Sequence, residues 1–386
     1  VQHSPFYKEN FCRLFKGMSW AHFDTVDDFL RQIKMEDVEK IKTRMVKLLI
    51  EKKRLSSFYG FYLIAIDATG ITTYDEDPED KLLHRTSANG KKTYLNIMLE
   101  AKIVTAEGLS ISIASEPLSN EETSTYEKQD CELKAFTRLS KKLKEMFPRL
   151  NICILIDALY ANNTVFNICK KQQWKYIVTL KDGNLPNLQN EITDTEEARR
   201  IRFERPVVKN KSKKEYGSIS YQCIEDINHK ENSFFWIECK YPPEINAKNG
   251  EEVPGKRFVY LTNFSLKEKD MSQKVGFIVK IAEAGRLRWK IENEGFNTQK
   301  NHGYHLHHKI SRSSVGTLHV YYIMLQIAHL INQLVIHSKG VVALREKFPK
   351  LSIRYLWERL RGFLENRILS FQRLDQNLER CQIRLE

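Results

Sequence analysis

The chain has 386 residues, enough for two or three domains, and its 41% hydrophobic content suits a soluble protein with a sizeable core. Lys and Arg outnumber Asp and Glu by 62 to 49, and the net charge of +13 favours a polyanionic partner, nucleic acid before an anionic membrane. No run approaches the roughly 18 apolar residues of a membrane span, so no membrane association is expected. The seven cysteines form no Cys-x-x-Cys pair, which argues against a zinc ribbon and for reduced thiols.

Residues 1–58 are predicted to be helical and basic. The segment VEKIKTRMVKLLIEKKRL combines apolar residues at helical spacing with seven Lys and Arg residues. Such a run is either a solvated helix face or a DNA contact. We assign this region to DNA binding, because the whole chain is basic.

The stretch 59–182 predicts a sheet with flanking helices. A polar loop, TTYDEDPEDKLLHRTSANGKK, is expected after the first strand, and the amphipathic helix KAFTRLSKKLKEMFPRL should stop at Pro148. The segments that predict strands are FYGFYLIAID, TYLNIMLEAKIV, LSISIASEPL, NICILID and WKYIVTLKD.

The next stretch, 183–265, predicts a mostly β insertion, because short segments rich in aromatic and β-branched residues alternate with polar or Gly/Pro turns. Helices return over 266–340, and the last region, 341–386, is basic and helical. The expected fold class is therefore α/β, with helical N- and C-terminal regions.

Two predicted buried strands end in an aspartate, LIAID at Asp67 and CILID at Asp157. A carboxylate at the end of a buried strand is costly unless something pairs with it, and a divalent cation is a natural partner. A lone strand-terminal Asp more often caps the following turn. Two such strands together favour a shared site at one edge of a sheet.

A third carboxylate, Glu292, lies four residues after Arg288 on one predicted helix face. A surface ion pair would explain the spacing, but Arg before Glu is the less favourable order for helix stability. The alternative is that Glu292 binds a cation while Arg288 grips a phosphate bidentately. Gly295 then either lets the nucleic-acid backbone approach closely or marks a helix irregularity.

The series LIAIDATGI, CILIDALYANN and RLRWKIENEGFNTQK resembles the DDE transposases of bacterial insertion sequences, in the branch that carries a large β insertion between the second Asp and the Glu. The resemblance covers roughly residues 60–340, and R-W-x-I-E is its most specific piece. That branch often has a Tyr three residues before the Arg and a Lys seven after the Glu. Gly285 and Gln299 occupy these positions here, and Lys300 follows.

The resemblance implies a ribonuclease-H-like mixed sheet with flanking helices, in which 59–182 and 266–340 form the catalytic core. Asp67, Asp157 and Glu292 would be the catalytic residues and would bind Mg²⁺, with Mn²⁺ able to substitute.

Five residues are expected to contact DNA. Trp289 either stacks on an unpaired base or packs into the core, and Lys181 is either a backbone contact or an ordinary exposed lysine. The five are Arg286, Arg288, Trp289, Lys300 and Lys181.

The implied function is metal-dependent cleavage at transposon ends and transfer of the freed 3′-OH into target DNA. The protein would act as a homodimer on terminal inverted repeats, in the cytoplasm of a bacterium and associated with the nucleoid. Two alternatives remain open: a catalytically inactive, transposase-derived DNA-binding protein, and a metal-dependent nuclease without strand transfer.

Overall fold

The computed structural model describes residues 4–16, 18, 19, 21–79, 81–120, 130–210, 215–245, 251–267, 270–308, 310, 311, 314–370 and 372. The chain divides into two compact units. The first, the helical unit, comprises 1–55, 74–80 and 297–386, and the second, the sheet unit, comprises 56–73 and 81–296. The predicted second half of the catalytic core, 266–340, is thus divided between the two units.

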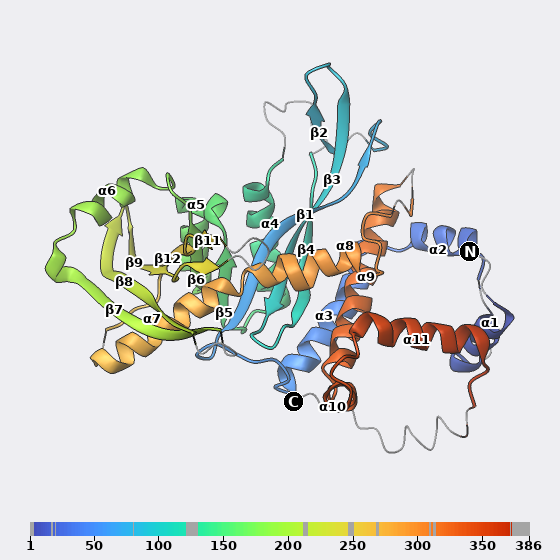
Figure 1. The fold of residues 1–386 in the computed structure, drawn as a ribbon. Helices are drawn as coiled ribbons and strands as arrows, with labels where there is room; N and C mark the ends of the chain where they lie inside the picture. Colours follow the sequence, from blue (N-terminus) through green and yellow to red (C-terminus); the bar gives the residue numbers. More distant parts are fainter. Residues whose placement is uncertain are drawn as a thin grey trace. The chain divides into compact units, whose positions relative to one another are not determined.

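The sheet unit is built on one mixed sheet with the strand order β2-β3-β1-β5-β6-β12-β9-β8-β7, and β4 pairs with β3 beside this path (Figure 1). The mixed α/β class is therefore confirmed. Its strands are β1 (Tyr62–Tyr74), β2 (Leu83–Thr86), β3 (Lys92–Val104), β4 (Ser110–Leu118), β5 (Ile152–Ile156), β6 (Lys175–Leu180), β7 (Arg200–Asn210), β8 (Glu215–His229), β9 (Asn232–Lys240) and β12 (Arg257–Thr262).

The centre of the sheet is parallel, because β5 pairs with β1 on one side and with β6 on the other. Every residue of β5 is buried, as expected for a strand covered on both faces. The predicted β insertion continues this same sheet: β12 runs antiparallel to β6 and leads through β9 and β8 to β7. A separate two-stranded sheet joins β10 (Glu244–Ile245) to β11 (Glu252–Val253).

Two features of this sheet differ from the prediction. Strand β1 does not end at Asp67 but continues to Tyr74. The segment predicted to be one polar loop contains a short strand, β2, which pairs with the start of β3. The strand β2 is short and lies at the edge of the sheet, where polar and charged residues are common, and the continuation of β1 mixes Ile71 and Tyr74 with polar and small residues that do not predict a strand.

Helices cover the sheet. Helix α4 packs against β3 and β4, α7 against β6 and β9, and α6 against β8. The helical segments of this unit are α4 (Glu132–Met146), η1 (Ala158–Tyr160), α5 (Asn163–Gln172), α6 (Pro186–Asp194), η2 (Glu197–Arg199), α7 (Met271–Arg286) and the π-helix η3 (Ile291–Asn297), whose last residue belongs to the helical unit.

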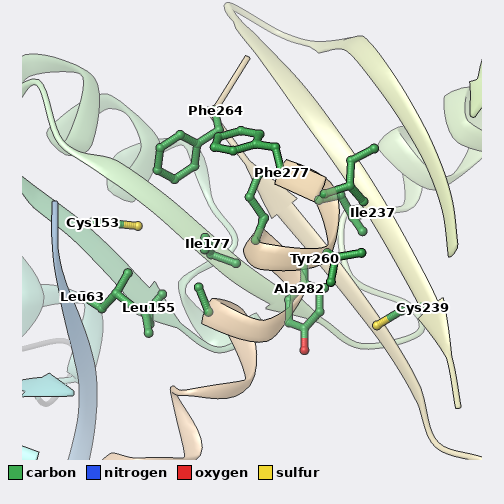
Figure 2. Close-up of a cluster of buried hydrophobic side chains, with 14 of the residues drawn as sticks. Leu63, Cys153, Leu155, Ile177, Ile237, Cys239, Tyr260, Phe264, Phe277 and Ala282 are labelled. Atoms are coloured by element: carbon green, nitrogen blue, oxygen red, sulfur yellow. The ribbon is translucent and has the colours of Figure 1, made fainter. Parts of the chain in front are cut away.

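The core beneath α7 joins the central strands to the insertion strands (Figure 2). Leu63 of β1, Leu155 of β5 and Ile177 of β6 lie in one cluster with Tyr260 of β12 and Phe277 of α7. Side chains alternate between the faces of a strand, so the odd-numbered residues of β1 and β5 face α7. This alternation also decides where the two aspartates point.

The helical unit contains α1 (Pro5–Leu14), α2 (Phe23–Gln32), α3 (Met35–Glu51), α8 (Thr298–Asn301), α9 (Val315–Ile336), α10 (Lys339–Lys347) and α11 (Ile353–Asn366). Helix α9 packs against α2, α3 and α10, and α1 packs against α11. Among the described helices, α9 is long and apolar enough to cross a membrane. A core helix of a soluble protein passes the same test, and the packing of α9 against three neighbours fits that explanation.

Candidate active site

Asp67 and Asp157 lie on neighbouring parallel strands. The β1–β5 ladder pairs Tyr62 with Ile152 and continues to Ala65 with Leu155, a constant offset of 90 residues. The ladder ends at this pair, and Asp67 and Asp157 follow it with the same offset of 90 residues. Neighbouring strands are about 4.8 Å apart, and both positions have the parity of the face covered by α7.

Local hydrogen bonds hold both carboxylates. Asp67 Oδ1 accepts from the Ala68 N–H at 3.0 Å. Asp157 caps the short helix η1, and its Oδ1 accepts from the Leu159 N–H at 2.9 Å. The capping explanation for Asp157 is therefore confirmed. This hydrogen bond occupies one oxygen of Asp157, which lies directly after the carboxyl end of β5.

Glu292 is brought to Asp67 through Arg288. The Arg288 Nη1 lies 2.9 Å from Glu292 Oε1 and 3.5 Å from Asp67 Oδ2. The side chain of Arg288 is only 9% exposed and that of Glu292 is 38% exposed, so a buried arginine meets a partly exposed carboxylate, unlike the surface pair considered from the sequence. A buried cation between two carboxylates offsets their mutual repulsion.

The electrostatics of Asp67 reflect this crowding. Burial raises the pKa of Asp67 to about 7, although the positive charge of Arg288 acts in the opposite direction. The charge of Glu292 and a hydrogen bond shared with its carboxyl group add to the increase. Close, partly buried carboxylates hold a proton at neutral pH because both cannot ionise cheaply. Once Asp67 loses this proton, the two carboxylates carry more negative charge than Arg288 neutralises.

Glu294, the other glutamate of the segment, forms an ion pair with Lys290. Its Oε1 lies 2.9 Å from Lys290 Nζ. The described contacts therefore connect Glu292, and not Glu294, to Asp67.

Two residues near Asp157 were missed in the sequence. The Tyr160 hydroxyl, in a side chain that is 1% exposed, donates to Glu132 Oε2 at 2.9 Å. Burial raises the pKa of Glu132, the Tyr160 hydrogen bond lowers it, and the charge of Asp157 raises it. In the sequence, Glu132 is an acidic residue in the first turn of a helix, which helix stability alone explains. The sequence therefore does not distinguish a Glu132 that only stabilises its helix from one that accepts a hydrogen bond from Tyr160 near Asp157.

Close packing explains why glycine occupies two positions near Arg288 in the sequence. Gly285 lies against the ring of Tyr260, where an added Cβ would be 2.5 Å from Cε1. A side chain larger than hydrogen is therefore excluded unless Tyr260 moves, which explains why no tyrosine stands there. Gly295 is buried in η3, and a Cβ would lie 3.1 Å from Ser110 Oγ and 3.3 Å from Lys102 Cδ. The irregular-helix explanation of Gly295 is confirmed, because Gly295 lies in the π-helix η3, and the absence of a side chain lets η3 pack closely on β3 and β4.

The five residues expected to contact DNA lie in different surroundings. Trp289 is 47% exposed, so the interpretation that it packs into the core is wrong. The guanidinium of Arg286 lies 4.6 Å from the Tyr241 ring centroid. Lys181 is exposed after β6, and Arg288 is buried between the carboxylates.

Lys300 belongs to the helical unit, where it is half-buried. Its neighbour Gln299 is fully buried and exchanges hydrogen bonds with Gln326 at 2.8 and 3.2 Å. Gln299 Nε2 also lies 3.0 Å from His329 Nδ1. Gln299 therefore links α8 to α9 through buried hydrogen bonds.

The donor set suits a hard cation. Asp67, Asp157 and Glu292 offer only carboxylate oxygens, and burial together with the charge of Glu292 makes ionised Asp67 costly unless a cation offsets it. Within the described part of the chain, no three or more His, Cys, Asp or Glu side chains are arranged as a metal-binding group. Arg288 supplies a positive charge beside Asp67 and Glu292.

A scan against protein-family models gives no match for the chain. A comparison with curated proteins gives none either.

Proposed function

We propose that this protein is a DNA transposase of the DDE type, with a ribonuclease-H-like core that carries Asp67, Asp157 and Glu292. One observation carries the proposal. Asp67 and Asp157 follow the β1–β5 ladder at the same 90-residue offset, and Arg288 Nη1 lies 3.5 Å from Asp67 Oδ2 and 2.9 Å from Glu292 Oε1. Helix stability does not require the contact between Arg288 and Asp67, which lie 221 residues apart in the chain.

The three carboxylates would hold Mg²⁺ ions, with Mn²⁺ as a substitute. Bound there, the ions would lower the pKa of an attacking water or 3′-hydroxyl and stabilise the leaving oxygen. Arg288 would keep Glu292 turned towards Asp67, and the hydrogen bond from Leu159 would fix the Asp157 carboxylate.

Four residues besides the three carboxylates would hold the DNA. The exposed Trp289 offers a face on which an unpaired base can stack. Lys300, Lys181 and Arg286 would contact phosphates. The reaction would hydrolyse a phosphodiester bond at a transposon end, and the freed 3′-OH would then attack target DNA. We expect a homodimer that holds two terminal inverted repeats, in a bacterial cytoplasm and at the nucleoid.

A second candidate, a catalytically inactive DNA-binding protein derived from such an enzyme, is favoured by one observation. Arg288 already contacts both Asp67 and Glu292, as a structural ion pair would. The third candidate, a nuclease without strand transfer, shares the carboxylates and differs only in the joining step.

A plasmid-integration assay in Mg²⁺ separates the three candidates. The unaltered chain is compared with Asp157→Ala, with Glu292→Gln and with the matched control Glu294→Gln. The transposase predicts joined products that fall at least about 1000-fold in the first two variants, since the metal contributes several kcal/mol to the barrier. The control should stay within a few-fold. Cutting without joining supports the nuclease, and DNA binding without either reaction supports the inactive protein.

A further inference from the structure

A basic β-ribbon projects from the edge of the sheet unit. It consists of β2, the turn 87–91 and the first residues of β3, and β2 is the last strand on this side of the sheet (Figure 1). Strand β4 pairs with β3 only from Ile97 onwards, so the ribbon extends past the end of β4. The sequence from 81 to 99 contains Lys81, Arg85, Lys91 and Lys92 and no acidic residue.

The ribbon presents positive charge on both faces. Arg85 pairs with Thr93 and Thr86 with Lys92 across the ladder. Successive side chains of a strand alternate, so Arg85 and Lys91 share one face and Lys92 lies on the other. All three are exposed.

The turn that carries these cations is well defined. The Ser87 N–H donates to the Lys91 carbonyl at 3.0 Å, and Gly90 has a φ of +80° that favours glycine. At the base, the rings of His84 and Tyr94 lie 5.9 Å apart across the strands. A short ribbon with a fixed tip holds its cations at constant spacing, which suits contact with a regular array of charges.

We infer that this ribbon contacts the phosphate backbone of duplex DNA, and this inference rests on the proposed function. The major groove is about 12 Å wide and admits a two-stranded ribbon. Cations on both faces would then meet the phosphates that flank the groove on either side. A one-sided basic patch would meet only one strand.

The competing explanation is that charged residues on an edge strand only prevent pairing with other chains. Charged residues near β2 are enough to prevent such pairing, and they need not contact phosphates. The two explanations differ in the salt dependence of DNA binding, because each phosphate contact releases counterions.

The test uses the full chain and a short mixed-sequence duplex in EDTA, so that binding is measured without chemistry. Binding of the triple variant Arg85→Gln/Lys91→Gln/Lys92→Gln is followed by fluorescence anisotropy over a salt series. We expect the slope of log K against log salt to become shallower by about 0.9 for each lost contact, or about 2.7 in all. The matched control removes three exposed cations from α4 and α5, Lys141→Gln/Lys170→Gln/Lys171→Gln, and should keep the original slope.

Equal slopes for the ribbon variant and the unaltered chain would overturn the inference, as would an equal loss in the control. If strand transfer in Mg²⁺ persists alongside such a result, the ribbon alone is excluded and the proposed function stands. If the unaltered chain binds no DNA, both the inference about the ribbon and the proposed function are wrong. Unchanged far-ultraviolet circular dichroism and thermal midpoints establish that the variants fold.

Discussion

Two polar clusters of the chain treat charge differently. In the sheet unit, the buried Arg288 lies between two partly exposed carboxyl groups, those of Asp67 and Glu292. In the helical unit, Gln299, Gln326 and His329 are uncharged or tautomeric groups that satisfy one another through hydrogen bonds. The second cluster is satisfied without any charge, whereas the charge balance of the first changes when Asp67 loses its proton. A polar cluster that stabilises its fold and one that awaits a partner can thus be told apart by their charge balance.

The largest expected effect follows from removing the arginine. Arg288→Met should destabilise the metal-free chain by about 3 kcal/mol, because both carboxylates lose their buried counter-charge while Glu292 remains partly solvated. Urea unfolding measures the change. The same substitution in an exposed pair, Arg354→Met beside Glu358, should cost less than about 1 kcal/mol.

Adding Mg²⁺ gives a second, more specific prediction for Arg288→Met. The cation should stabilise Arg288→Met more than the unaltered chain, because it can supply the missing positive charge. Equal stabilisation of both would mean that the carboxylates do not bind the ion together.

The next effect depends on pH. The folded-state pKa of Asp67 is raised to about 7 from an ordinary value of 3.8, so the folded chain binds a proton that the unfolded chain releases between these values. Stability should therefore fall as pH rises through this window. Asp67→Asn should be about 2 kcal/mol more stable than the unaltered chain at pH 8 and nearly equal at pH 4 in thermal unfolding without metal.

Asp37 provides the control for this experiment. A hydrogen bond from Lys40 lowers the pKa of Asp37, which is the opposite direction. Asp37→Asn should not become more stable at pH 8. A gain in both variants would contradict the assignment to Asp67.

A smaller effect is expected in the neutral network. Gln299→Leu leaves the Gln326 amide and the His329 ring without one partner each, which should cost about 1–2 kcal/mol in urea unfolding. Unlike Arg288→Met, this loss should be insensitive to Mg²⁺. If Mg²⁺ restored the stability of Gln299→Leu, the two clusters would not differ in their response to a cation.

The smallest effect compares two glycines. Gly295→Ala beside Glu292 would press a Cβ against Lys102 and Ser110, and we expect a loss of about 1 kcal/mol. Gly276→Ala in α7 meets nothing within 4 Å and should gain about 0.5–1 kcal/mol from helix propensity. Thermal midpoints that move in the same direction would exclude close packing at Gly295.

Much of the sheet could be predicted from the sequence, because apolar strands such as ILID and their terminal aspartates carry a local signal. The parts that failed depend on partners distant in the chain. The continuation of β1 and the short strand β2 have no apolar pattern of their own. Whether Arg288 is buried depends on Asp67, 221 residues away, and the role of Glu132 depends on Tyr160. Spacing places such residues on an element but does not reveal what that element packs against.

The constant 90-residue offset between β1 and β5 has a consequence for engineering. Backbone pairing of β1 with β5 fixes where the chain reaches Asp67 and Asp157, so the loops between the two strands can be lengthened, shortened or replaced by a grafted module without changing which residues of β1 and β5 pair. One extra residue inside β1, by contrast, would turn Asp67 to the opposite side of the sheet, although the count of acidic residues and the composition of the chain would hardly change.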